Sequence, residues 1–567
     1  MKNSTVPTSK KYRSIREMLD LICKENTSKP AFYVKQGSKY RPVKYARMRS
    51  DIRSLGVTLM HRGLLGKKIL LLGDNSYQWS LTYLTALCGL GVIVPINKET
   101  PSEDLCEIAK TTSAAAVIYS SSYEKKIEAL PKKLQKITFD EIFTLCDQGT
   151  LYPDFELREF DSVSIDSDAL ATIVYTKESN GTLLGVMLSQ RNLCAAIEGL
   201  SLALPMQKDG VSLTLLPSHY AYQSVAGLLF PLSQGNAVAF TEALRTTMQN
   251  AKEVSPTSII CTSSVLERIY KKIWANIRKR EIEDKVASLI KTTDMIKIPA
   301  LRLKAKKKTF KEIHDSFGGK LDFIMVNGFA TDPEAIKGMR AFGFNIIQTY
   351  GVTESAALTA ITAQDSKAQG VTARALPLGE LKIADADGNG TGEICYRGDN
   401  VMLGYYKQEE LTKEAKQNGW IRTGDIGSLD DEGNLTILGR KKNAIPASQG
   451  RFVYPKELER LIFRSSYVKE CAVIGIPNKD RVQKDVVAVI YPDFSYAKEM
   501  LGVYSSRPMI KEKLSVAIAD INSRLPQYKR ISYFVMLDEE IPKNAYKKIE
   551  RQTLPDYIKS EYLIFED

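Results

Sequence analysis

Gln348-Thr-Tyr-Gly-Val-Thr-Glu354 is the stretch around which the rest of the chain is organised, and it continues directly from the short apolar run Phe344-Asn-Ile-Ile347. The run predicts a buried strand, and the glycine that follows predicts a turn. The hydroxyl of Thr353 and the carboxylate of Glu354 are hard oxygen groups that can serve a phosphate and its Mg²⁺ together. Tyr350 can cover a flat ring. Any junction between a strand and a loop could look like this, so motifs elsewhere in the chain decide its meaning.

Short apolar runs alternate with helical patterns through the first part of the chain. This βαβ alternation predicts an α/β fold in which helices sandwich mixed or largely parallel sheets. From about Leu381 the pattern changes to short strands separated by the turn-rich tips Asp385–Gly390 and Asp430–Asn434, which predicts a small β-rich subdomain of hairpins. The predicted strands are Lys68–Leu72, Ala115–Tyr119, Thr172–Tyr175, Val211–Leu216, Ser258–Cys261, Leu321–Val326 and Asn345–Gln348.

The chain has 567 residues, which is enough for two or more domains with large cores. Arg440-Lys-Lys-Asn443 is a polar junction after which a new α/β unit begins. We therefore expect an N-terminal domain over residues 1–439 and a small C-terminal domain over residues 440–567.

Composition argues against several classes of protein. Eight cysteines form no Cys-x-x-Cys pair and only three histidines occur, which argues against a disulfide framework, a zinc site and a multi-histidine metal site. Reduced thiols and a polar N-terminus predict a cytoplasmic protein. The nearly uncharged stretch Trp79–Ile96 is broken by two glycines and closed by Pro95, so we expect a helix over Ser80–Leu90 and a strand over Val92–Val94 rather than a membrane span.

The net charge is +13, and most of the excess lies between Leu266 and Lys320, where 16 Lys or Arg stand against 7 Asp or Glu, a local net of +9. Ser264 and Glu267 have the spacing of a capping box and predict a helix start. Beyond them an apolar stripe at helical spacing predicts a surface helix packed on the core. The charge fits peripheral contact with anionic lipid or with an acidic carrier protein. Nucleic acid is not expected, because no nucleic-acid-binding module accompanies the charge.

Further polar motifs precede and follow the central stretch. Thr172–Ser189 has the pattern of a strand, a polar loop with Gly181 and Gly185, and a second strand, and small residues let backbone N–H groups approach phosphate oxygens. Leu216-Pro-Ser-His-Tyr220 places a histidine after a strand, where a lone histidine is more often structural than functional. Asp425 follows a tight turn and suits the hydroxyls of a ribose. The remaining motifs are Asn327-Gly-Phe-Ala330, Ile437-Leu-Gly-Arg440 and Ile541–Arg551.

In this order the motifs resemble the adenylate-forming superfamily of acyl-CoA synthetases, adenylation domains and luciferase-like enzymes. The resemblance extends from about Tyr40 to Arg551, and Leu216–Tyr222 with the basic segment after Ser264 is similar to the long-chain fatty acyl-CoA synthetase branch. It implies a large N-terminal domain and a small mobile C-terminal domain. It also implies that ATP and Mg²⁺ convert a fatty acid into an acyl-adenylate, whose acyl group then passes to the thiol of CoA or of the phosphopantetheine on acyl carrier protein.

The resemblance implies a role for each matching residue. Tyr350 would stack on adenine, Thr353 would contact phosphate and Glu354 would hold Mg²⁺. His219 would lie beside the acyl pocket, and Lys548 would stabilise the charge that develops during adenylation. The other implied positions are Thr176, Lys177, Ser179 and Gly181 in the phosphate loop, Asn327, Gly328 and Gly351 near adenine, Asp425 and Arg440 at the ribose, Lys442 at the hinge, and Ser448-Gln-Gly450 facing the thiol.

The phosphate loop departs from the family pattern Ser-Gly-Thr-Thr-Gly-x-Pro-Lys-Gly. Leu184 stands at the position of the usual lysine, and Glu178 stands at the position of a glycine. A carboxylate beside a triphosphate is repulsive, but Lys177 could replace the lost cation or neutralise Glu178. The other departures are Phe329, Arg451, Phe452 and Lys547.

Three functions therefore stay open at this point. We favour a fatty acid:CoA ligase, because Thr353, Glu354, Asp425, Arg440 and Lys548 are all present. An acyl-acyl carrier protein synthetase is the nearest alternative, and the basic region fits an acidic carrier. A catalytically weakened protein that binds acyl chain or nucleotide without turnover is the third, and the altered phosphate loop favours it.

Overall fold

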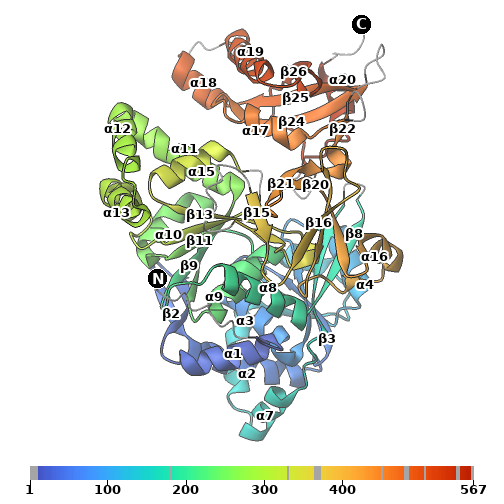
Figure 1. Ribbon diagram of the computed structural model, residues 1–567. Coiled ribbons are helices and arrows are strands. Elements are labelled where there is room, and N and C mark those ends of the chain that lie inside the picture. Colours follow the sequence, from blue (N-terminus) through green and yellow to red (C-terminus); the bar gives the residue numbers. More distant parts are fainter. Residues whose placement is uncertain are drawn as a thin grey trace. The chain divides into compact units, whose positions relative to one another are not determined.

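The computed structural model describes residues 11–562, except for 179–180, 329–330, 363–371, 448–450, 478–483, 503–505 and 545–548 (Figure 1). Contacts divide the chain into two compact units. Unit 1 comprises Met1–Lys382, Cys395–Thr423 and Asp430–Leu435, and unit 2 comprises Ile383–Ile394, Gly424–Leu429 and Thr436–Asp567. The division at residue 439 drawn from the sequence stays a prediction.

The first sheet of unit 1 is mixed. Its central strands are continuous apolar runs such as Ile69–Leu72, which is fully buried, as expected for a sheet covered on both faces. In order across the sheet the strands are β18 (Gly404–Tyr405), β8 (Leu183–Ser189), β7 (Leu170–Lys177), β4 (Gly91–Ile96), β3 (Lys67–Leu72), β5 (Ala116–Tyr119) and β6 (Gln135–Thr138). Strands β7, β4, β3, β5 and β6 run parallel, whereas β7, β8 and β18 pair antiparallel.

The second sheet of unit 1 has a parallel centre with antiparallel strands at its margins. The carboxyl ends of its parallel strands share one edge, which is where open α/β sheets bind ligands. In order the strands are β15 (Thr372–Ala375), β14 (Ala360–Ile361), β13 (Asn345–Tyr350), β12 (Phe323–Asn327), β11 (Ser258–Thr262), β9 (Val211–Thr214), β10 (Ala237–Phe240), β1 (Pro30–Gln36) and β2 (Lys39–Lys44). All seven predicted strands are confirmed, and the two sheets also contain β1, β2, β6, β10, β14, β15 and β18, which were not predicted.

Helices of unit 1 share one large apolar core, into which Trp79 and Phe230 are completely buried. The stretch Trp79–Ile96 forms the end of a helix, a π-helical turn over Ala86–Leu90 and strand β4, so the predicted helix and strand are confirmed. In the described part of the chain no helix is long and apolar enough to cross a bilayer. The helices around this core include α1 (Ile15–Glu25), α2 (Tyr45–His61), α3 (Tyr77–Thr85), α8 (Gln190–Ala203) and α9 (Phe230–Ser233).

Helix α11 (Ser263–Lys279) confirms the predicted apolar stripe but not the predicted capping box. Leu266, Ile273 and Ile277 are buried against the second core of unit 1. Its N-cap residue, Thr262, makes no side-chain cap bond. The carboxylate of Glu267 instead accepts a hydrogen bond from the backbone N–H of Asp332 at 2.8 Å, so a tertiary contact replaces the local one.

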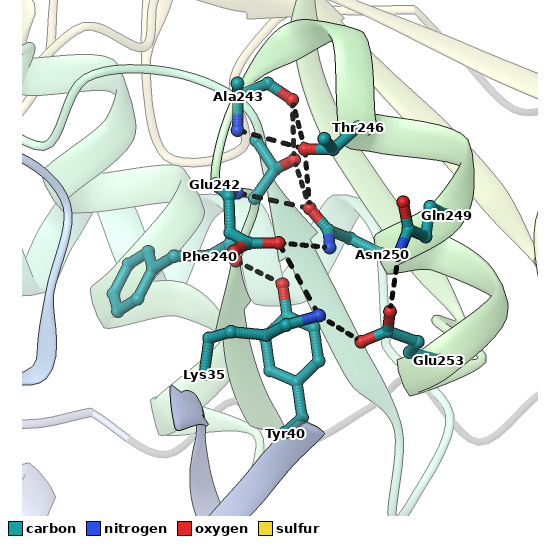
Figure 2. Close-up of polar contacts among 10 residues, drawn as sticks. Lys35, Tyr40, Phe240, Glu242, Ala243, Thr246, Gln249, Asn250 and Glu253 are labelled. Carbon is teal, nitrogen blue, oxygen red and sulfur yellow. Dashed lines mark hydrogen bonds and ion pairs between the residues drawn. The ribbon is translucent and has the colours of Figure 1, made fainter. Parts of the chain in front are cut away.

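A polar network lies at the β2 edge of the second sheet, next to the end of β10 (Figure 2). The ammonium of Lys35 on β1 lies 2.5 Å from a carboxylate oxygen of Glu253 in helix α10 (Thr247–Val254) and 3.5 Å from one of Glu242. Asn250 donates to Glu242 at 3.0 Å, and the hydroxyl of Tyr40 donates to a backbone carbonyl of β10 at 2.6 Å. The network therefore fastens the β1–β2 hairpin to α10 and β10.

The β-rich subdomain consists of β16 (Glu380–Ala384), β17 (Gly392–Arg397), β20 (Trp420–Leu429) and β21 (Leu435–Arg440). Both predicted turn tips lie between consecutive strands, which confirms the hairpins. In the first tip, Asp387 accepts backbone N–H bonds from Asn389 at 2.9 Å and Thr391 at 3.0 Å. In the second, Asp430 accepts them from Glu432 at 3.1 Å and Asn434 at 2.7 Å. Aspartates at these positions act as Asx turns.

Unit 2 contains the predicted new α/β unit. Its three-stranded sheet packs with helices around Glu459, whose side chain is almost fully buried. Burial alone would raise the pKa of this carboxyl, but Lys456, Arg551 and the N–H of Val473 lower it. The elements are α17 (Pro455–Ile462), β24 (Val468–Pro477), β25 (Lys484–Pro492), α18 (Phe494–Leu501), α19 (Arg507–Ser523), β26 (Tyr533–Met536) and α20 (Leu554–Tyr562).

All eight cysteines are free thiols, which agrees with the expectation from their spacing.

Candidate active site

Two neighbouring parallel strands of unit 1 end side by side and carry four of the predicted site residues. Thr349 on β13 lies opposite Asn327 on β12. The N–H of Gly328 donates to the carbonyl of Thr349 at 3.0 Å. Asn327 and Gly328 therefore lie beside Tyr350 and Gly351, as parallel strands with a common carboxyl edge require.

The loop after Tyr350 folds back on itself very closely. A Cβ atom on Gly351 would lie 2.2 Å from the carbonyl oxygen of Ala357, so only glycine fits here. Ala356 and Ala357 have φ of +49° and +63°, in the left-handed region that costs energy for residues other than glycine. Thr353 and Glu354 lie in the short 3₁₀ turn Thr353–Ser355 between these points. The two residues that follow the turn are thus held in an unfavourable backbone geometry by their surroundings.

Asn400 supplies much of that support. Its side-chain amide is buried and donates to the carbonyls of Ser355 at 2.8 Å and Leu358 at 2.6 Å. The hydroxyl of Tyr396 in turn donates to the amide oxygen of Asn400 at 2.8 Å. Sequence analysis did not identify Asn400, and an asparagine more than forty residues from the loop gives no local signal.

The carboxylate of Glu354 is oriented by Tyr405. The phenol donates to Oε1 of Glu354 at 2.8 Å, and the N–H of Met402 donates to the backbone carbonyl of Glu354 at 2.8 Å. Tyr405 belongs to β18, which pairs with β8. Among the residues that the structure describes, only Tyr405 bonds this carboxylate, which leaves Oε2 for another ligand. Glu354 is thereby held against the strand that follows the predicted phosphate loop.

That phosphate loop is the hairpin between β7 and β8. Lys177 pairs with Leu183, and Thr176, which is half-buried, pairs with Leu184. Gly181 has φ of +89° and its N–H donates to the carbonyl of Glu178 at 3.1 Å, so these two residues are hydrogen-bonded across the loop. Ser179 lies outside the described residues.

The altered positions of this loop have clear places in the structure. The side chain of Leu184 is buried in the large core of unit 1 and is 6% exposed. The ammonium of Lys177 lies 2.7 Å from the carboxylate of Asp104 in helix α4 (Ser102–Thr112), at a partly buried position. The missing lysine is therefore replaced by a core residue, and the nearby lysine has an acidic partner. A role for Lys177 toward phosphate stays a prediction.

His219 lies in the segment that follows β9, and the structure fixes this segment firmly. Asn75 donates to the carbonyl of Leu216 at 2.7 Å and accepts the N–H of Ser218 at 2.7 Å. Within the described part of the protein Nε2 of His219 has no hydrogen-bond partner. Burial, reinforced by Lys98, lowers the pKa of His219 to about 3, so the imidazole is neutral at physiological pH.

The buried neutral His219 is expected to make stability depend on pH. Between pH 6.5 and 3 the unfolded chain binds this proton and the folded protein does not, so the free energy of unfolding falls as pH falls. The loss is about 1.4 kcal/mol per pH unit. Urea unfolding at pH 7 and pH 5 should show that wild type loses about 2 kcal/mol more than His219→Gln. Equal losses in the two proteins would show that His219 is protonated in the folded state.

Asp425 and Arg440 lie next to each other in unit 2. The guanidinium Nε of Arg440 lies 2.8 Å from Oδ1 of Asp425, whose side chain is 8% exposed. Beside them Glu393 pairs with Lys441 at 3.0 Å. Lys442 lies in the exposed 3₁₀ turn Lys441–Asn443. Lys548 and Ser448–Gly450 lie outside the described residues, so their roles stay predictions.

In the described residues no cluster of three His, Cys, Asp or Glu side chains could hold a metal ion by itself. A Mg²⁺ ion at Glu354 would therefore take its remaining oxygen ligands from a nucleotide and from water, which is the usual arrangement for Mg²⁺ bound with phosphates.

Residues 20–406 match the AMP-binding enzyme family, and the chain belongs to this family. This confirms the adenylate-forming superfamily indicated by the motifs. Fatty acyl-CoA synthetase B of Dictyostelium discoideum is 28% identical over 453 residues, which are 76% of this chain and 65% of that protein. Long-chain-fatty-acid--CoA ligase 6 of Mus musculus is 28% identical over 385 residues, which are 62% of this chain and 53% of that protein. The matches thus span between about half and two thirds of these relatives.

Solved structures confirm the fold. The o-succinylbenzoate CoA synthetase of Bacillus subtilis, in complex with its acyl-adenylate intermediate, is 20% identical with a TM-score of 0.73 and covers 95% of this chain and 97% of that one. The Mycobacterium tuberculosis fatty acyl CoA synthetase is 21% identical with a TM-score of 0.65, covering 97% and 99%. Both alignments extend through unit 1 and unit 2, and the predicted α/β fold is confirmed.

Proposed function

We propose that this protein is an AMP-forming fatty acid:CoA ligase that acts on long-chain fatty acids. The observation that carries the proposal is the fixed geometry of Glu354, whose carboxylate is oriented by Tyr405 beside the β7–β8 hairpin. The names of the related proteins, which are fatty acyl-CoA synthetases, support the substrate and the CoA acceptor.

The proposed chemistry has two steps. A carboxylate oxygen of the fatty acid attacks the α-phosphorus of ATP, the bond from that phosphorus to the bridging oxygen breaks, and pyrophosphate leaves. The thiolate of CoA then attacks the carbonyl carbon of the acyl-adenylate, and AMP leaves. Mg²⁺, when bound, neutralises charge on the phosphate oxygens. Both steps spread negative charge over oxygens, so positioned cations and hydrogen-bond donors are the main requirement.

Each residue has a proposed part in these steps. Glu354 supplies an oxygen ligand to Mg²⁺ and Thr353 donates its hydroxyl to phosphate. Tyr350 stacks on adenine. Lys548 stabilises the developing charge of the first step. Asp425 and Arg440 bind the ribose, Lys442 acts as the hinge of a mobile C-terminal domain, and His219 lines the acyl pocket as a neutral group.

Two alternatives have support of their own. The burial of Leu184 and the pairing of Lys177 with Asp104 favour a protein with weakened turnover, since both remove cationic charge from the phosphate loop. The +9 region between Leu266 and Lys320 favours acyl carrier protein as the acceptor in place of CoA. Contact of the same region with a membrane also stays a proposal, because charge alone fits either partner.

Exchange of labelled pyrophosphate into ATP, measured with fatty acids from short to long, tests the proposal. Wild type should catalyse exchange only when a long-chain acid and Mg²⁺ are present. Lys548→Ala should lower the exchange rate by about 10²–10³-fold, whereas the neighbouring Lys547→Ala should change it little. Absence of exchange with every acid, in folded protein, would leave binding without turnover as the function.

A further inference from the structure

Helices α12 (Glu283–Asp294) and α13 (Pro299–Thr309) form a distinct edge of unit 1. They pack against each other and stand at the rim of the unit, as the green helices in Figure 1 show. We call residues 295–308, which comprise the connection between them and most of α13, the α12–α13 edge.

Large apolar side chains are concentrated on this edge and point to solvent. Met295 is 80% exposed, Ile298 is 56% exposed and Leu301 is 54% exposed. Leu303 is also exposed, so four such residues fall within nine positions of the chain. Single exposed apolar residues are normal, but a contiguous group of them usually marks an interaction surface.

Unneutralised positive charge surrounds these apolar residues. No acidic residue occurs between Asp294 and Glu312, whereas seven basic residues do. Lys306 pairs with Asp294 at 2.7 Å, and Lys311 pairs with Asp315. Among the residues that the structure describes, the other five cations form no ion pair, although Lys307 donates to the carbonyl of Leu321 at 3.4 Å. These five are Lys297, Arg302, Lys304, Lys307 and Lys308.

We propose that the α12–α13 edge docks this protein on the surface of an anionic lipid bilayer. Met295, Ile298 and Leu301 enter the boundary between headgroups and acyl chains, while Lys297 and Lys304 bind lipid phosphates. Exposed apolar residues flanked by Lys and Arg are the pattern of segments that lie in the interface, and here they occupy the connection between two short helices and the start of α13. Each cation near such a surface adds attraction to the anionic headgroups.

A bilayer explains the edge better than an acidic carrier protein does. The cations alone would attract either partner, but the edge also exposes three large apolar side chains at intervals of three residues, Met295, Ile298 and Leu301. A bilayer is also where long-chain fatty acids accumulate, an argument that rests on the proposed function. Helix α11 begins beside the loop at Gly328, where the hydroxyl of Ser263 donates to the Gly328 carbonyl at 3.1 Å, and it leads toward this edge. The edge that would dock on a bilayer and the loop of the candidate site therefore belong to the same unit.

Sedimentation with vesicles tests the proposal and does not require turnover. Wild type should bind vesicles of phosphatidylcholine mixed with phosphatidylglycerol and bind phosphatidylcholine alone weakly. Replacing the apolar residues together, as Met295→Ser, Ile298→Ser and Leu301→Ser, should lower the partition coefficient at least tenfold, to roughly 1% to 10% of wild type. Replacing Lys297→Gln and Lys304→Gln should lower it roughly 20-fold on the anionic vesicles only.

Leu151→Ser with Phe155→Ser is the matched control, because these apolar residues are 84% and 68% exposed but lie away from the edge in the sequence. This variant should bind vesicles as wild type does. Unchanged binding by the Met295, Ile298 and Leu301 variant would overturn the proposal, as would a wild type that binds acyl carrier protein through the edge and no vesicle. Pyrophosphate exchange without vesicles should be measured on the same proteins. A protein that catalyses exchange but does not bind vesicles would contradict only the membrane proposal, whereas a protein that binds vesicles but catalyses no exchange would contradict only the proposed function.

Discussion

Glu354→Gln should lower acid-dependent exchange of pyrophosphate into ATP by about 10²–10³-fold while the protein stays folded. The change keeps the size of the side chain and the acceptor for the Tyr405 hydroxyl, but it removes the negative charge that the proposed Mg²⁺ site requires. The measurement is the exchange rate at saturating ATP over a range of Mg²⁺ concentrations. Higher Mg²⁺ should restore part of the rate, because the defect lies in cation binding.

Tyr405→Phe is the matched control for that variant. It keeps the carboxylate charge and removes only the 2.8 Å hydrogen bond that orients it, so we expect a loss of about tenfold, within the usual range for misplacing a catalytic group. Full exchange activity in Glu354→Gln would show that Glu354 does not hold the metal ion, and the assignment of this loop would then be wrong.

Gly351→Ala should destabilise the protein by about 3 kcal/mol or more and also lower adenylation about 100-fold. The added Cβ atom would meet the backbone oxygen of Ala357 at 2.2 Å, and backbone cannot rotate away as a flexible side chain can. Relief of the clash must move the turn that carries Thr353 and Glu354. Chemical denaturation and pyrophosphate exchange should report the two losses.

Gly388→Ala provides the comparison for that prediction. A Cβ atom there would meet nothing within 4 Å, so its effect should stay within about 0.5 kcal/mol of zero. Equal stability of the two alanine variants would mean that the loop after β13 relaxes freely. The close approach of Gly351 to the Ala357 carbonyl would then contribute nothing to the difference in the free energy of unfolding.

The sequence predicted the sheets well because their strands are continuous apolar runs with local turn signals. Lys68–Leu72 and Asn345–Gln348 each match a strand to within two residues at either end. The capping box failed for a different reason. Glu267 had the right spacing to cap α11, but Asp332, far away in sequence, provides an N–H that competes for the same carboxylate.

The candidate site was predictable only where it is local. Tyr350, Thr353 and Glu354 are neighbours in sequence, so a motif reveals them. Asn400 supports the loop and Tyr405 orients the carboxylate of Glu354, but both residues are distant in sequence and come close only in the folded protein. No local sequence pattern identifies either residue. The partner of Lys177 is likewise Asp104, on a helix 73 residues earlier, and charge pairing over that distance cannot be deduced without coordinates.

The attachment of β1 to β10 has a consequence for synthesis of this chain. Phe32 lies opposite Val238, and the Lys35 network reaches Glu253. At roughly 5–20 residues per second, the ribosome needs on the order of 10–40 s to make the roughly 200 residues between these partners. For that time one side of β1 is an unpaired strand edge in the nascent chain, a known starting point for aggregation. Slow codons between residues 45 and 237 would lengthen this exposure.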